Sequence, residues 1–284
     1  MYRFMQAVAC PTKRLAYGTM GLLFVNYSVA GILTNFATPP ALILSRCWGW
    51  TIKDFSGIFG WRVLLGIVIV NVLYFFLFRS DFSKLKKMLH KEEEALDADA
   101  HKGPVPLWIT FVHLGFLAWT IGTAHYVPVF LGSYFLFLGF HQATRMHQYT
   151  LNLKRPLMVG LFLAGLVIHG GFQEWWIKPL VGDLSYGTML LSSTFLTAFT
   201  ENTTVAYFAC FLTDLKPTIQ YALVGGLVAG GGLTIMAHAP NPAGQSLLRP
   251  YFPSGISPWN LFLAALFPTL IFLAIFFFFP ASPV

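Results

Sequence analysis

The polar residues that could bind or carry an ion are concentrated in a few short stretches of an otherwise apolar chain. The clearest is Glu201, which lies between apolar runs and is followed by Asn202 and Thr203. A carboxylate among apolar helices is costly when ionised, so it favours a bound proton or a bound cation. A site that exchanges protons for sodium ions is the chemistry of an antiporter, and we expect Glu201 to carry the proton. The alternative is that this turn reaches water and Glu201 is an ordinary loop residue.

Neutral oxygen donors form the second group of candidates. Hard cations prefer oxygen ligands, and unwound backbone carbonyls add to the side-chain oxygens. Each residue alone is as well explained by capping, because Thr and Asn also bond the loose ends of helices. As a set they are confined to one turn and two interrupted helices, and we predict that they bind the ion: Thr34, Asn35, Thr38, Asn202, Thr203, Thr234 and Asn241.

His238 lies inside the second interrupted helix, and Thr38 holds the matching place in the first. Two interpretations of His238 stay open: a proton-carrying partner of Glu201, or a neutral hydrogen-bonding residue in a turn. The sequence shows no His/Cys cluster with metal spacing, no nucleotide-binding loop and no Ser/His/Asp pattern. We therefore expect no enzyme activity, no cofactor and no metal beyond a sodium ion at these residues.

The composition indicates a polytopic α-helical membrane protein. The chain has 284 residues, of which 56% are hydrophobic and only 10% charged, and its mean hydropathy is +0.65. Several apolar runs exceed the roughly 18 residues that suggest a spanning helix. The net charge of +7 then bears on orientation in the lipid bilayer and does not indicate nucleic-acid binding. Cys10, Cys47 and Cys210 have no motif spacing and are interpreted as small packing residues, with no disulfide expected.

Two stretches break apolar helices in the same way. The stretch 229–244, AGGGLTIMAHAPNPAG, combines glycines with prolines, and both weaken a helix interior. In hydrocarbon the freed backbone groups must find partners, and such discontinuous helices line ion or substrate sites near the bilayer centre. Laid on residues 231–240 without a gap, residues 31–40 match at five positions and so predict an internal repeat: Gly31, Leu33, Thr34, Ala37 and Pro40.

The remaining elements follow from the lengths of the apolar runs. We predict a first repeat in residues 1–79, a charged cytoplasmic linker in 80–105 and a second repeat in 106–284. The pieces 184–199 and 204–212 are too short to span, so 183–213 is predicted to be a re-entrant hairpin. The other predicted elements are a helix over 15–33 broken at 34–40, a short helix over 41–49, spans at 61–78, 106–124, 127–142 and 156–176, a broken helix over 217–248 and a last span at 259–279.

The positive charges predict the orientation. The linker after Phe78 and the loop 145–155 are rich in Lys and Arg, and two predicted spans between them place both on one side. The positive-inside rule makes that side the cytoplasm, together with the N-terminus. The two broken helices then run in opposite directions. An inverted repeat of this kind is typical of secondary transporters.

These residues also resemble a known family. The segments VNYSVAGILTNFATPPALI, TAFTENTTVAYFA and VAGGGLTIMAHAPNPAG are similar to those of sodium/proton antiporters of the ion transporter superfamily, which includes arsenite permeases and sodium/dicarboxylate symporters. The symporters carry Ser-Asn-Thr at each hairpin tip and a Thr-Pro-Pro-type turn in each broken helix. Here Glu201-Asn202-Thr203 and Thr38-Pro39-Pro40 hold those places. The resemblance implies antiport of sodium ions and protons across a bacterial inner membrane. It also implies alternating access, in which the hairpin and the broken helices move against the other spans. Finally, it implies a homodimer.

One departure from the family pattern leaves alternatives open. Family members have a first hairpin before the first broken helix, whereas only about fifteen residues precede that helix here. The resemblance therefore implies a chain shortened at its N-terminus. A second chain could supply the first hairpin, or the protein could be an inactive or split subunit. The other transport hypothesis is sodium-coupled transport of a carboxylate or oxyanion, against which the negative charge of Glu201 argues.

Overall fold

The computed structural model describes residues 12–85, 105–123, 126–148, 151, 153–170, 172, 175, 179, 184–212, 215–249, 252 and 255–281. Within these ranges every regular element is a helix, which confirms the predicted all-α class. The chain divides into two compact units, one of Met1–Glu92 with Val159–Val284 and one of Glu93–Met158. Both interrupted helices belong to the first unit.

The chain before the linker contains α2 (Lys13–Ala30), the 3₁₀ turn η1 (Gly31–Leu33), α3 (Pro39–Trp48) and α4 (Ile52–Leu77). Thr12 caps α2, because its Oγ1 accepts a hydrogen bond from the Leu15 amide at 3.2 Å. The predicted first helix, its interruption and the short helix after it are confirmed. The structure describes residues 105 and 80–85 of the predicted linker, and 86–104 lie outside the described residues.

The helix of the next predicted span is α4, which starts at Ile52, nine residues before the expected start of the span at Trp61. A capping box fixes this start: the Thr51 amide donates to the Asp54 carboxylate at 2.7 Å. With 26 residues the helix is about 39 Å long, more than the roughly 30 Å of a hydrocarbon core. The helix is therefore longer than a span needs, and its polar first turns were left out of the predicted span because of their low hydropathy.

After the linker the first unit continues with α10 (Tyr186–Phe199), α11 (Asn202–Ala209), α12 (Pro217–Gly230), α13 (Asn241–Leu248) and α14 (Pro258–Phe278). Helices α10 and α11 have 14 and 8 residues, below the roughly 20 that a spanning helix needs. The predicted pair of short helices, the second broken helix and the last span are present close to their expected bounds.

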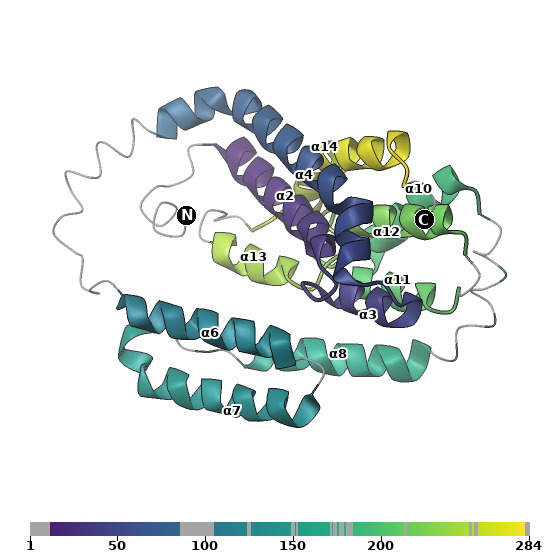
Figure 1. Cartoon of the computed structure of the whole chain (residues 1–284). Coiled ribbons are helices and arrows are strands. Elements are labelled where there is room, and N and C mark those ends of the chain that lie inside the picture. Colours follow the sequence, from purple (N-terminus) through teal and green to yellow (C-terminus); the bar gives the residue numbers. More distant parts are fainter. Residues whose placement is uncertain are drawn as a thin grey trace. The chain divides into compact units, whose positions relative to one another are not determined.

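The second unit contains α6 (Leu107–Thr123), α7 (Val127–Ala143) and η2 (Arg145–His147), and α6 and α7 lie side by side (Figure 1). Helix α8 (Lys154–Gly170) starts in this unit and continues into the first. The three stretches predicted as spans at 106–124, 127–142 and 156–176 are thus helical over most of their described residues, and each helix has 17 residues. Residue 171 and most residues from 173 to 183 lie outside the described part of the chain.

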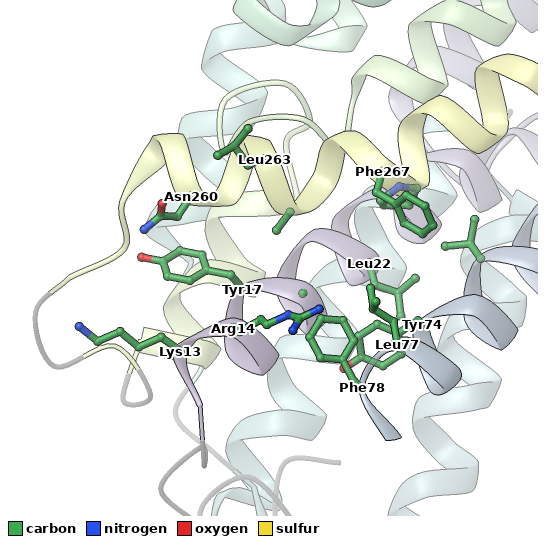
Figure 2. A pocket seen from close by; sticks show the side chains of 14 residues that line it. Lys13, Arg14, Tyr17, Leu22, Tyr74, Leu77, Phe78, Asn260, Leu263 and Phe267 are labelled. Atoms are coloured by element: carbon green, nitrogen blue, oxygen red, sulfur yellow. The ribbon is translucent and has the colours of Figure 1, made fainter. Parts of the chain in front are cut away.

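Helix α12 is the centre of the first unit and is buried without interruption from Tyr221 to Gly230. It packs against α10 and α14, while α2 packs against α14 and α4 (Figure 1). Glycine allows the closest approach: a Cβ at Gly226 would lie 2.2 Å from the carbonyl oxygen of Leu190 in α10. Helices α2, α4 and α14 leave a cavity between them at one end of α2 (Figure 2).

Three helical segments among the described residues are long and apolar enough to cross a membrane: Lys13–Leu33, Ile52–Leu77 and Pro258–Phe278. Their outward side chains are large and apolar, as in Leu64 (57% exposed) and Phe76 (63% exposed). A water-soluble surface seldom carries so much contiguous apolar area. The chain is an integral membrane protein.

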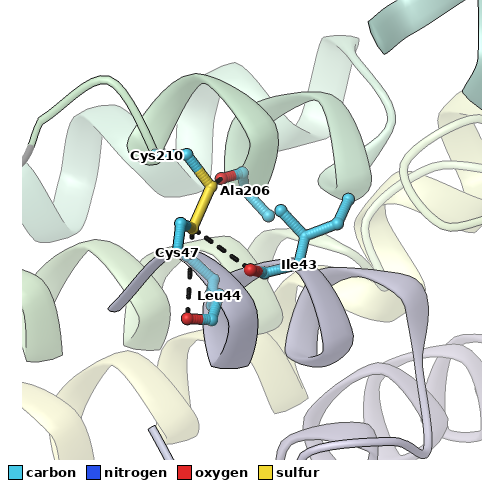
Figure 3. The surroundings of a disulfide bond; sticks show 5 residues. All are labelled: Ile43, Leu44, Cys47, Ala206 and Cys210. Atoms are coloured by element: carbon cyan, nitrogen blue, oxygen red, sulfur yellow. Dashed lines mark hydrogen bonds between the residues drawn. A yellow bond between two sulfur atoms is a disulfide. The ribbon is translucent and has the colours of Figure 1, made fainter. Parts of the chain in front are cut away.

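The interpretation of all cysteines as packing residues is wrong for two of them. Cys47 in α3 and Cys210, directly after α11, form a disulfide with an S–S distance of 2.08 Å and a Cα–Cα distance of 5.5 Å (Figure 3). The two are separated by 163 positions in sequence, so no local spacing could reveal the pair. The packing of α11 against α3 brings them together. Cys10 lies outside the described residues.

Candidate functional site

The two interruptions, the first break (residues 34–38) and the second break (residues 231–240), follow helices that end alike. Helix α2 is capped by Gly31 with φ −62° and ψ −18°, and α12 is capped by Gly231 with φ −63° and ψ −15°. These are the first paired residues of the sequence match. The same residue type thus ends both helices with nearly the same backbone conformation.

A threonine turn then recurs in both breaks. In the first, the Ala37 amide donates to Thr34 Oγ1 at 3.1 Å, and in the second the Ala237 amide donates to Thr234 Oγ1 at 3.1 Å. A side-chain oxygen here replaces the backbone acceptor that the interrupted helix no longer supplies. The identical residues of the two stretches therefore also form equivalent hydrogen bonds.

Side chains near the start of the following helix hold each break closed. Asn241 Nδ2 donates to the carbonyl oxygens of Gly231 and Thr234, both at 2.8 Å, and Asn241 is 2% exposed. In the first break Thr38 Oγ1 donates to the Gly31 carbonyl at 3.2 Å. The carbonyl of the capping glycine is therefore satisfied by a side chain in both breaks, as burial in an apolar surrounding requires.

Glu201 lies between α10 and α11 as the N-cap of α11. Its carboxylate accepts hydrogen bonds from the Thr203 amide and from Thr203 Oγ1, each at 2.7 Å. The amide of Ala239, in the second break, lies near this carboxylate. Glu201 is half-buried and Thr203 is fully buried. A partly buried carboxylate at a helix N-terminus is stabilised by these amides and keeps lone pairs for a proton or a cation.

Further hydrogen bonds join the α10–α11 turn (residues 200–203) to the second break. The Asn202 amide donates to the Ala237 carbonyl at 2.9 Å, and Thr234 Oγ1 donates to the Ala198 carbonyl at 2.9 Å. Residues predicted from two distant stretches of sequence thus meet at one place. The structure brings together Glu201, Asn202, Thr203, Thr234, His238 and Asn241.

Several buried polar atoms around this place have no hydrogen-bond partner among the described residues: Asn202 Oδ1, Thr197 Oγ1 and both ring nitrogens of His238. His238 is fully buried, and its ring centroid lies 5.6 Å from that of Tyr27. Buried polar atoms are normally bonded, so unpartnered ones mark a place where a ligand can be accepted. Thr197 was not predicted; it lies in the last turns of α10, and a Cβ at Gly230, the last residue of α12, would lie 3.0 Å from its Cβ.

Ser28 is a second buried residue that the sequence analysis missed. Its Oγ donates to the Val228 carbonyl at 2.7 Å. A Cβ at Gly231 would lie 2.2 Å from Ser28 Oγ and 3.1 Å from Asn202 Nδ2, so both side chains meet the glycine at the start of the second break. The sequence feature that could have identified Ser28 is its position three residues before Gly31, in the last turn of α2.

The remaining predicted residues form their hydrogen bonds with the first break and with the elements on either side of it, η1 and α3. Thr34 accepts the Ala37 amide, Thr38 donates to Gly31, and Asn35 Nδ2 donates to Ser45 Oγ at 3.4 Å. Their role as ion ligands stays a prediction. Within the described parts of the chain no group of three or more His, Cys, Asp or Glu side chains could hold a metal ion.

One comparison with known proteins assigns the chain. A family model described as "Putative Na+/H+ antiporter" matches residues 4–279, nearly the whole chain. No curated protein and no solved structure matches. The family is one of transporters and not of enzymes, in agreement with the apolar helices and the paired breaks. The chain belongs to the Putative Na+/H+ antiporter family.

Proposed function

We propose that the chain exchanges sodium ions for protons at the α10–α11 turn and that Glu201 holds either the ion or the proton. The observation that carries this proposal is the half-buried Glu201 carboxylate, which is bonded to the start of α11 in a turn that is itself bonded to the second break through Asn202 and Ala237. An ionised carboxylate there needs compensation, which a sodium ion or a proton supplies. Because both occupy the same group, each displaces the other.

Oxygen atoms close to the turn supply the rest of the proposed sodium site. Asn202 Oδ1 and Thr197 Oγ1 are buried and unpartnered in the described chain, and both are hard donors of the kind that a sodium ion accepts. Thr203 Oγ1 donates its proton to Glu201 and keeps lone pairs for the ion. These three oxygens would therefore be available as ligands when a sodium ion replaces the proton at Glu201.

We assign His238 as a neutral neighbour of the site and not as a second proton carrier. Its ring is fully buried, neither nitrogen has a partner among the described residues, and the adjacent ring is that of Tyr27. A charged imidazolium in such surroundings would lack compensation, so the uncharged ring is the stable form.

The same proposal includes an inverted repeat with a re-entrant α10–α11 hairpin and a cytoplasmic N-terminus. The matching glycine caps and threonine turns support the repeat. The disulfide supports the orientation, because Cys47 and Cys210 then lie toward the outer side, where disulfides form and persist. Movement of the hairpin and the second break, which share hydrogen bonds, would expose the site alternately to the two sides.

This orientation predicts which side reaches the disulfide. In a Cys10→Ser variant in intact cells, a membrane-impermeant maleimide should label the chain only after treatment with an impermeant phosphine reductant. Variants Cys47→Ser and Cys210→Ser should each be labelled without reductant, since each frees the other thiol. Labelling that requires permeabilised cells would contradict the orientation, and labelling of the untreated chain would contradict the disulfide.

Transport itself is tested in vesicles that contain only this purified chain. Antiport predicts that an inward sodium gradient drives protons out, reported by an internal pH dye, and that labelled dicarboxylate is not accumulated. Sodium-coupled anion transport predicts the reverse pattern and would overturn the proposal. If the well-folded chain moves neither, a second chain would be needed.

A further inference from the structure

The cavity between α2, α4 and α14 belongs to no part of the proposed ion site. Its volume is about 420 Å³, within the roughly 300–1,000 Å³ of small-molecule sites. Residues Lys13 to Leu22 of α2, Val70 to Phe78 of α4 and Asn260 to Pro268 of α14 contribute to its lining. At 1.5 Å per residue each of these stretches is about 12–14 Å long, so the cavity, called the slot below, extends along about two turns of each helix.

The slot is polar at one end and apolar along its length. Lys13, Arg14 and Asn260 are exposed at the first end, whereas Leu22 and Phe267 lie toward the other (Figure 2). The Arg14 guanidinium lies 5.5 Å from the centre of the Phe78 ring, which holds the charge beside the apolar wall. Asp81, the buried acidic residue near this end, accepts a hydrogen bond from Thr12 at 3.2 Å. Among the described residues at this end, Lys13 and Arg14 outnumber Asp81 and leave an excess of positive charge at the mouth.

The slot is kept open by small residues and close helix contacts. A Cβ at Gly21 would lie 2.8 Å from backbone atoms of Ala264 and Ala265, so α2 and α14 touch just beside the cavity. Gly18 faces the Phe78 ring, where a Cβ would come within 2.4 Å of a ring carbon. Because these contacts fix the helix spacing, the side chains between them cannot close the slot by simple collapse.

We propose that this slot binds one anionic phospholipid, with an acyl chain between α2, α4 and α14 and its phosphate at Lys13 and Arg14. The apolar length excludes a free inorganic anion as the main ligand, and the two cations select an anionic headgroup over a zwitterionic one. The orientation proposed above puts this end at the cytoplasmic leaflet, whose anionic lipids attract basic residues near the membrane surface. The lipid would tie the start of α2 to α4 and α14.

The experiment titrates delipidated, full-length protein in detergent with phosphatidylglycerol or phosphatidylcholine of the same acyl chains and counts bound lipids by native mass spectrometry. One phosphatidylglycerol should bind saturably, and phosphatidylcholine and free glycerol phosphate should bind far more weakly. The double variant Lys13→Gln with Arg14→Gln should bind phosphatidylglycerol with an affinity about thirtyfold lower, because each basic residue raises the affinity by a factor of roughly five. Leu263→Trp should fill the slot and abolish saturable binding.

Two matched variants separate the site from general effects. Arg46→Gln with Lys53→Gln removes two exposed positive charges outside the slot, and Leu270→Trp adds the same indole to α14 at an exposed position outside the lining. Both should bind phosphatidylglycerol as the unmodified chain does. Equal affinity for the two lipids, or equal losses in the site and matched variants, would overturn the proposal. Tight binding of free glycerol phosphate would show a soluble anion site instead.

Discussion

Replacing Glu201 by glutamine is expected to reduce sodium-driven proton flux to the level of vesicles without protein. The amide has nearly the shape of the carboxylate and one oxygen to accept the Thr203 bonds, but it stays neutral and can neither release nor take up a proton in the physiological pH range. The N-cap of α11 is weakened and not lost, so stability should fall by about 1 kcal/mol or less. Flux is measured with an internal pH dye and stability by thermal unfolding in detergent.

Asp54→Asn is the matched control for this charge. Asp54 is also an acidic residue at a helix start, bonded to Thr51 in the capping box of α4. It lies outside the proposed ion site, so its variant should keep the flux at a similar cost in stability. Unchanged flux in Glu201→Gln would remove Glu201 from the mechanism, and equal losses in both variants would show a structural effect only.

Gly226→Ala should give the largest loss of stability among single-methyl changes. The added Cβ would lie 2.0 Å from Ser193 Oγ and 2.2 Å from the Leu190 carbonyl oxygen. The hydroxyl can rotate away but the backbone carbonyl cannot, so α10 must move from α12. Overpacking of this kind costs typically 1–3 kcal/mol. Because α10 ends at Glu201, the flux should fall as well.

The control for this prediction is Gly57→Ala, where the added Cβ has no atom within 4 Å. Alanine favours a helix interior over glycine by about 1 kcal/mol, so this variant should be as stable as the unmodified chain or more so. Unfolding temperatures in detergent compare the two. If the unfolding temperature of Gly226→Ala were no lower than that of Gly57→Ala, the account of a close contact between α10 and α12 would be contradicted.

The sequence was most informative where residue type or segment length restricts the backbone conformation. Glycine and proline in an apolar run predicted both breaks, and the length of the short apolar pieces predicted α10 and α11. The turn with Glu201 was predicted over residues 200–203, whereas α11 already begins at Asn202. Asn and Thr readily occupy the first helical turn after a capping residue, so polarity alone overestimated the length of the turn.

Long-range packing explains what the sequence could not predict. The disulfide depends on the contact between α3 and α11, and its 163-residue separation gives no local signal. Ser28 was missed because a serine in an apolar helix commonly bonds its own helix backbone, whereas this one bonds the carbonyl of Val228 in the neighbouring helix α12. The early start of α4 is a different case, because its signal is local: the capping pair Thr51 and Asp54 marks the helix start, whereas the prediction followed hydropathy.

The most direct test of the central claim is equilibrium binding of radiolabelled sodium to the purified chain at several pH values. Sodium and protons compete for Glu201 in this account, so the Kd for sodium should rise steadily as the pH is lowered. Glu201→Gln should bind sodium weakly and with no such dependence. Sodium binding that is saturable but unchanged with pH, or equally pH-dependent in Glu201→Gln, would contradict exchange of the ion and the proton at this residue.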